Sequence, residues 1–276
     1  MTRFVKPYLL FAVLSITCLA QNAQVSVKRP VHGIPTRQKA AQPGTTNNGI
    51  PYLGGPVLNQ PTGVNVYYIW YGNWSGDSSK QMLTDFTQRL GGSPYFYINT
   101  TYYDLDKGGQ QDPVFNKVNL VASVNDNYSM GQSLADLDVD QLVANHTGVD
   151  LPIDENGVYF VLTSADVSEQ EFCVNDCAWH NAATVSYPGL PETKDIKVAF
   201  VGNPNQCPAG CLVQDPSPNN NPAADSMASF VAHELKNRSR IRTLTRGTTA
   251  TSTRTETCAS GRLVAIGPCP TAPFTT

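Results

Sequence analysis

The sequence predicts an α/β or α+β domain with a mixed central sheet and flanking helices. Short runs of β-branched and aromatic residues, bounded by turn residues, are typical of buried strands. Segments with apolar residues at helical spacing lie between these runs. With 276 residues and 41% hydrophobic content, the chain can form one sizeable core. Strands that alternate with helices therefore indicate a single layered domain.

The strands are expected in apolar segments. VNVYYIWY at 64–71 is apolar on both faces, which is typical of a central strand. Residues 95–103 form a short aromatic strand or loop. Three further strands are predicted at 113–124, 158–163 and 197–202.

The helices are expected where the apolar period changes. Residues 78–90 carry apolar side chains at helical spacing and end at a glycine pair. Residues 133–145 alternate acidic and apolar side chains in a helical pattern. A proline- and asparagine-rich loop at 215–222 precedes a third helix at 226–235, for which Asp225 is the predicted N-cap.

The N-terminal residues predict secretion. Residues 1–20 are typical of a signal peptide, with Arg3 and Lys6 before an apolar stretch and Ala20 as a small residue for cleavage. Residues 21–52 are rich in Gln, Pro, Thr, Asn and Gly and predict a flexible leader. We therefore expect an extracellular chain with no membrane span.

The cysteine pattern supports an oxidising compartment. Two Cys-x-x-x-Cys pairs predict disulfides rather than metal thiolates, with local pairing and cross-pairing both open. They are Cys173, Cys177, Cys207 and Cys211. Four Asn-x-Ser/Thr sequons are glycosylation candidates. Their asparagines are Asn73, Asn99, Asn127 and Asn145.

One helix carries half of a zinc-protease motif. His233 and Glu234 match the first two positions, in which the histidine binds the metal and the glutamate is the general base. The second histidine of the motif is replaced by Asn237, a poor ligand. On a zincin-like fold, His233 is therefore the metal candidate and Glu234 the catalytic candidate. The alternative is an ordinary helical pair.

Other polar and aromatic residues have two interpretations each. His180 is either a metal ligand or acid/base group, or a hydrogen-bonded histidine beside a disulfide-held loop. Asp166, Glu169 and Glu171 either form a metal or sugar site or lie in a solvated loop. Exposed members of the many aromatic residues between 70 and 103 would suit stacking on carbohydrate. The acidic domain and a tail without aromatic residues between its basic ones argue against nucleic acid.

Several motifs together resemble the EXORDIUM, or phosphate-induced protein 1, family of secreted proteins. The matching stretches, in order, are GGPVL, VNVYYIWYGNW, SPYFYINTTYYD, VYFVLTSADV, FCVNDCAWH, KVAFVGNPNQCPAGC and SPNNNPAADSMASFVAHEL, between residues 54 and 235. The resemblance implies an apoplastic or cell-wall protein linked to growth or nutrient response, with no established catalytic activity.

The chain departs from the family pattern after Leu235. Residues 1–235 have a net charge of −9, whereas residues 236–276 have +6 and are rich in Thr and Arg. This tail has no apolar face and three late prolines, so we expect it to be disordered. A one-base shift of reading register, with permitted synonymous codons, regenerates the family's EEPVTDPDLDAWYDS and DLCEWTFG. We hypothesise a frameshift, which sequencing of the transcript would test.

The predicted organisation has four parts: a signal peptide (1–20), a leader (21–52), an EXORDIUM-like domain (53–235) and an aberrant basic tail (236–276). The first functional hypothesis is a secreted matrix protein that acts by binding, with glycans as the expected partners. The second is a metal-dependent hydrolase. Its zinc site would gain a ligand in an intact relative, where the restored register places a glutamate four residues after the histidine, so that both can face one metal. It is incomplete in this chain.

Overall fold

The computed structural model describes residues 22–35, 57–105, 109–213 and 216–240. The predicted signal peptide, most of the leader and the tail from residue 241 lie outside the described residues.

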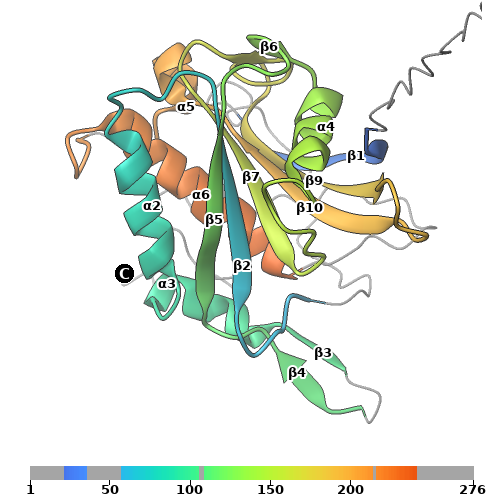
Figure 1. Cartoon of the computed structure of the whole chain (residues 1–276). Helices are drawn as coiled ribbons and strands as arrows, with labels where there is room; N and C mark the ends of the chain where they lie inside the picture. The colour runs from blue at the N-terminus through green and yellow to red at the C-terminus, as the bar shows by residue number, and fades with distance from the viewer. Residues whose placement is uncertain (1–21, 36–56, 106–108, 214–215, 241–276) are drawn as a thin grey trace, which may run out of the picture.

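A six-stranded mixed sheet forms the centre of the domain, as predicted (Figure 1). Its strands lie in the order β1-β9-β10-β7-β2-β5. Their bounds are Gln24–Pro35 (β1), Asp176–Ser186 (β9), Lys194–Val201 (β10), Gly157–Thr163 (β7), Val64–Tyr71 (β2) and Val118–Asp126 (β5). β10, β7, β2 and β5 run parallel to one another, whereas β9 is antiparallel to both β10 and β1.

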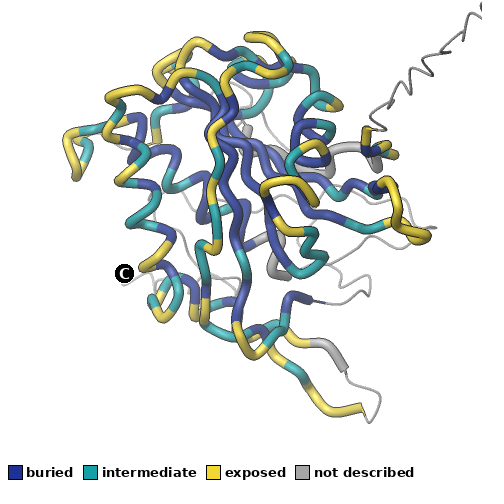
Figure 2. The backbone as a smooth tube through the Cα atoms, in the orientation of Figure 1, coloured by how far each residue is buried: buried dark blue, intermediate teal, exposed yellow. Residues whose placement is uncertain are grey.

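Helices cover both faces of this sheet. α4 (Asp136–His146) packs on one face, against β1, β10 and β7. α2 (Ser79–Leu90) and α6 (Pro222–Arg240) pack on the other, α2 against β5 and α6 against β9, β10 and β7. Figure 2 shows the central strands as the buried middle layer. β2 and β7 are buried almost throughout, which explains their continuous apolar sequences.

Short elements connect these layers. They are α3 (Pro94–Tyr97), η1 (Ile98–Thr101), β3 (Tyr103–Leu105), β4 (Gln111–Pro113), β6 (Ser133–Leu134), β8 (Ser168–Glu169), η2 (Pro204–Gln206) and α5 (Pro208–Cys211). Most of segment 95–103, predicted as strand or loop, forms α3 and η1. Ser93 accepts a hydrogen bond from the Phe96 N–H at 3.1 Å, and Pro94 occupies the first helical turn. This capping favours a helical turn despite the aromatic composition.

Helix α6 differs from its prediction at both ends. It begins at Pro222, and Asn221 rather than Asp225 caps it, accepting a hydrogen bond from the Ala224 N–H at 3.0 Å. Asp225 lies inside the first turn and accepts a hydrogen bond from the Asn219 N–H at 3.1 Å. The helix also continues to Arg240, past the predicted domain boundary at 235.

Two sheet strands were not predicted. Residues 24–35, placed by the sequence in a flexible leader, form edge strand β1 along β9. β9 itself, DCAWHNAATVS, mixes small and polar residues without a clean alternation, and two of its polar residues, His180 and Asn181, are buried and bonded to side chains of α6 and α4. Among the residues that the structure describes, no helix is both long and apolar enough to cross a membrane.

Candidate functional site

Two disulfides hold the chain around β9. Cys173 pairs with Cys207 and Cys177 with Cys211, with Cα–Cα distances of 5.7 and 5.5 Å. The predicted disulfides are therefore present, and they join the two Cys-x-x-x-Cys segments in the crossed arrangement rather than within each segment. The bridges connect the turn before β9 (Cys173) and the beginning of β9 itself (Cys177) to the segment after β10.

His180 and Glu234 meet between β9 and α6. The Nδ1 atom of His180 forms a hydrogen bond with Oε2 of Glu234, and the two residues are only 5% and 0% exposed. If the glutamate is ionised, the ring must carry its proton on Nδ1. Glu234, the predicted catalytic residue, thus faces the sheet and ties α6 to β9.

The predicted metal ligand lies beside this pair. His233 is half-buried on α6. Within the described ranges, no three His, Cys, Asp or Glu side chains come together in a way that could hold a metal ion. The side chain at the degenerate motif position, Asn237, is not described. A zinc site at His233 and Glu234 stays a prediction.

On the opposite face of β9, polar groups meet the start of α4. Asn181 donates a hydrogen bond to Oδ2 of Asp140 at 2.8 Å, and both residues are buried. Burial, together with the neighbouring carboxyl of Asp136, raises the pKa of Glu169 to about 8, while the indole N–H of Trp179 opposes the shift. Glu169 therefore favours its protonated form near neutral pH.

Two of the three carboxylates grouped by the sequence, Asp166 and Glu169, have different surroundings. Asp166 is exposed and accepts hydrogen bonds from Ser164 Oγ and Tyr128 OH, both at 2.5 Å. Those bonds hold its pKa below the usual range. Glu169 instead is buried and accepts a hydrogen bond from the Phe172 N–H at 3.0 Å. These different partners do not suit a shared metal or sugar site.

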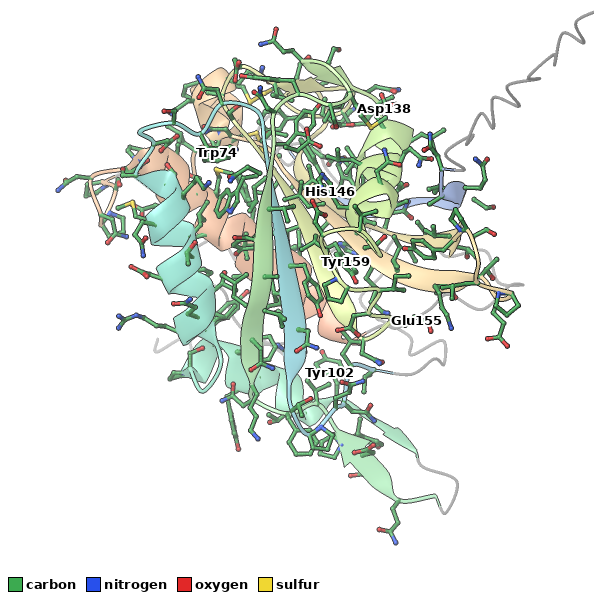
Figure 3. The ribbon with its side chains drawn as sticks, in the orientation of Figure 1. Trp74, Tyr102, Asp138, His146, Glu155 and Tyr159 are labelled. Atoms are coloured by element: carbon green, nitrogen blue, oxygen red, sulfur yellow. A yellow bond between two sulfur atoms is a disulfide. The ribbon has the colours of Figure 1, made fainter. Side chains whose placement is uncertain are left out.

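A second histidine, the half-buried His146, contacts two carboxylates, and the sequence analysis did not predict this cluster. The Nε2 atom of His146 lies 3.0 Å from Asp126 Oδ2, and its Nδ1 atom lies 2.9 Å from Asp150 Oδ1. Both nitrogens can donate only when the ring carries two protons. Figure 3 shows His146 and Asp138 on α4. Only the spacing of His146 and Asp150 signals this centre, because Asp126 lies 20 positions away.

The predicted glycosylation sites differ in exposure. Asn73, Asn127 and Asn145 are exposed, whereas Asn99 is fully buried in η1. Burial of Asn99 makes it the least accessible of the four acceptors. Glycosylation at all four stays a prediction.

The aromatic residues divide between core and surface. Trp70, Tyr71, Trp74 and Phe96 are buried. Tyr97 and Tyr103, near the β3–β4 hairpin, are 63% and 41% exposed. Tyr95 and Tyr102 are half-buried. Most of the tryptophan–tyrosine block therefore belongs to the hydrophobic core, and a small subset remains available for stacking on a ligand.

Relatives of the chain carry EXORDIUM names. It is 29% identical over 241 residues to Protein EXORDIUM-like 5 of Arabidopsis thaliana, covering 78% of this chain and 64% of that protein. Protein EXORDIUM-like 3 of the same plant is 29% identical over 208 residues, covering 67% and 59%. Protein PHOSPHATE-INDUCED 1 of Nicotiana tabacum is 27% identical over 214 residues, covering 68% and 64%.

The chain thus spans about three fifths of the length of these relatives. No solved structure matches it. The family model described as the phosphate-induced protein 1 conserved region matches residues 50–240, which contain β2 to α6. The chain therefore belongs to the phosphate-induced protein 1 (EXORDIUM) family.

Proposed function

We propose that this chain is a secreted protein of the cell wall or extracellular matrix that acts by binding, with glycans as its ligand class. The observation that carries the extracellular part is the pair of crossed disulfides, Cys173–Cys207 and Cys177–Cys211. Such bridges persist in oxidising compartments and are rare in reducing ones. A role in the response to phosphate is suggested by the name of the tobacco relative, Protein PHOSPHATE-INDUCED 1.

Binding is favoured over catalysis by the surroundings of Glu234. A general base must reach a water molecule or the substrate. Glu234 is fully buried and bonded to His180, so its carboxylate is already used to join α6 to the sheet. Half-buried and exposed tyrosines supply surfaces on which sugar rings can stack.

Secretion is tested by expressing the full chain, with a C-terminal tag, in a eukaryotic host. The expected product is found in the medium or wall fraction, and Cys173, Cys177, Cys207 and Cys211 are blocked to thiol reagents until a reductant is added. A chain that stays in the cytosol with these four thiols reduced would contradict the extracellular proposal.

Glycan binding is tested separately with the secreted full chain. A panel of immobilised matrix polysaccharides should retain it, whereas a matrix without sugar should not. The heat-denatured chain is the control for unspecific adsorption. A folded chain that no polysaccharide retains would overturn the binding proposal and leave the extracellular one unaffected.

A further inference from the structure

The two crossed disulfides differ in their exposure to solvent. Cys177 and Cys211 are buried in the hydrophobic core, with exposed fractions of 2% and 1%. Cys173 and Cys207 are only half-buried at the edge of that core. A thiol must reach a sulfur atom before it can exchange with a disulfide. We therefore expect the outer bridge, Cys173–Cys207, to react before the inner bridge, Cys177–Cys211.

The residues next to the outer bridge are open to solvent. Val174, which follows Cys173, is 68% exposed. Gln206 and Pro208, on either side of Cys207, are exposed as well. An incoming thiol therefore meets uncovered chain beside both cysteines of this bridge.

The backbone of Cys173 has an unfavourable conformation. Its φ angle is +67°, in the left-handed region that favours glycine. The turn helps to hold it there, because the N–H of Cys173 donates to the carbonyl of Asp176 at 3.0 Å. Residues held in such conformations concentrate at functional and switch regions. Exposed disulfides in strained surroundings are also easier to reduce than buried, relaxed ones.

The inner bridge makes the outer bridge dispensable for holding the chain together. Each bridge closes a loop that spans 34 positions. The two loops nearly coincide, because both ends are Cys-x-x-x-Cys segments. When the outer bridge opens, the inner bridge still closes a loop of the same length around β10 and most of β9. Opening should therefore change only the turn before β9 and the segment after β10.

These two segments lie at the carboxyl ends of parallel strands. The turn before β9 belongs to the connection that follows β7, and η2 and α5 follow β10 directly. Figure 1 shows α5 at this end of the sheet. Open α/β sheets hold their ligands at the carboxyl ends of their strands. The outer bridge therefore restrains two of the loops from which a ligand site at this edge would be built.

We propose that Cys173–Cys207 is a thiol-exchange site, which a dithiol donor opens while Cys177–Cys211 stays intact. One thiolate of the donor attacks a sulfur of the outer bridge. A mixed disulfide forms, and the other cysteine leaves as a thiolate that takes up a proton. The second thiol of the donor then displaces the first cysteine, so that the donor leaves as a disulfide and two electrons have reduced the bridge. The exchange loosens the two loops at the carboxyl edge.

Stepwise reduction of the secreted full chain tests the order of opening. The chain is equilibrated with mixtures of reduced and oxidised dithiothreitol, free thiols are alkylated, and peptide mass spectrometry locates them. Cys173 and Cys207 should be alkylated in mixtures that leave Cys177 and Cys211 blocked. The expected separation is about tenfold or more in equilibrium constant, or about 30 mV for a two-electron couple. Simultaneous opening, or earlier opening of the inner bridge, would overturn the proposal.

Two double variants separate the surroundings of a bridge from its loop length. Cys177→Ser/Cys211→Ser keeps only the outer bridge, and Cys173→Ser/Cys207→Ser keeps only the inner one. Each variant retains one loop of 34 positions, so they are matched controls for each other. The outer bridge should again be reduced about tenfold more readily, and equal equilibrium constants would contradict the proposal. Should either variant fail to fold, the wild-type titration decides alone.

Amide hydrogen exchange tests whether opening is local. It is measured on the wild-type chain in a mixture that opens only the outer bridge. Exchange should become faster in the turn before β9 and in η2 and α5, and stay unchanged in β9 and β10. Faster exchange throughout these two strands would show that the inner bridge does not hold them, and would overturn the local role of the outer bridge.

The source of the thiols is identified with a second donor. A Cys-x-x-Cys oxidoreductase is set to the potential at which dithiothreitol opens the outer bridge. A faster opening assigns the donor to a protein, and an unchanged rate assigns it to a small dithiol. An outer bridge that neither donor opens before the inner one overturns the exchange.

The untreated chain distinguishes this proposal from the proposed function. Four reactive thiols before any reductant is added would contradict the extracellular proposal and remove the bridge on which the exchange depends. Four blocked cysteines that become reactive together would leave the extracellular proposal standing and overturn this one. Glycan binding is not involved in either outcome.

Discussion

The two faces of β9 are built from different chemistry. Toward α6, His180 meets Glu234, a pair in which a ring N–H faces a carboxylate. Toward α4, Asn181 meets Asp140, and Glu169 meets Asp136, a second acid. On the first face, an imidazole N–H can donate to an ionised carboxylate. On the second, burial and the neighbouring carboxyl of Asp136 favour the protonated form of Glu169. Loss of a side chain should therefore lower the unfolding free energy most on the α6 face. A change of pH should alter the unfolding free energy through the α4 face.

The largest effect is expected from Glu234→Ala. It leaves the buried His180 without its partner, and breaking such a pair costs about 3–5 kcal/mol of unfolding free energy. Urea denaturation measures the change. Glu192→Gln, at an exposed position, should shift stability by less than about 0.5 kcal/mol. A Glu234→Ala variant as stable as that control would show that the α6 face does not depend on the pair.

Removal of the disulfides tests whether the stability of the domain depends on both bridges or on either one alone. Each bridge spans 34 residues, and closing such a loop is worth about 4 kcal/mol in the chain-entropy account. Because the two loops nearly coincide, removing Cys173–Cys207 alone should cost much less than removing both. Thermal unfolding of the two serine variants gives the comparison. Equal, additive losses would contradict it.

The α4 face should respond to pH. The pKa of Glu169 is raised from 4.5 to about 8 in the folded chain, so the folded state binds the proton more tightly than the unfolded state. This group should therefore make the fold more stable as pH falls from about 8 toward 4.5, by at most about 1.4 kcal/mol per pH unit. Glu169→Gln should flatten that slope when urea denaturation is repeated across this range. An unchanged slope would place the titrating group elsewhere.

The smallest effect is expected from metal removal. Because Asn237 replaces the second histidine of the zinc motif, we predict little or no hydrolytic activity for this chain. A chelator should change neither peptide hydrolysis nor thermal stability. Metal content measured in an intact relative, with and without its His-Glu pair, is the companion experiment. Robust protease activity abolished by the chelator would revive the hydrolase hypothesis.

The strands and helices with regular patterns could be predicted from the sequence. β2 and β7 are continuous apolar runs, and α2 has a helical apolar stripe, so local chemistry determines them. β9 lacks such a pattern because its buried polar residues are satisfied by distant helices. The sequence singled out His180 and Glu234 separately. Their contact spans 54 positions, and no local spacing encodes it.

The crossed disulfides also have a mechanical consequence for a protein that would be anchored in a matrix under tension. Each bridge closes a loop that contains all of β10 and all or nearly all of β9, so a force that pulls on the chain at the two sides of the loop is carried by the disulfide rather than by the backbone of those strands. When either bridge alone is broken, the other still prevents a loop of 34 positions from extending. Only reduction of both would release about 120 Å of extra chain length, at roughly 3.5 Å per residue.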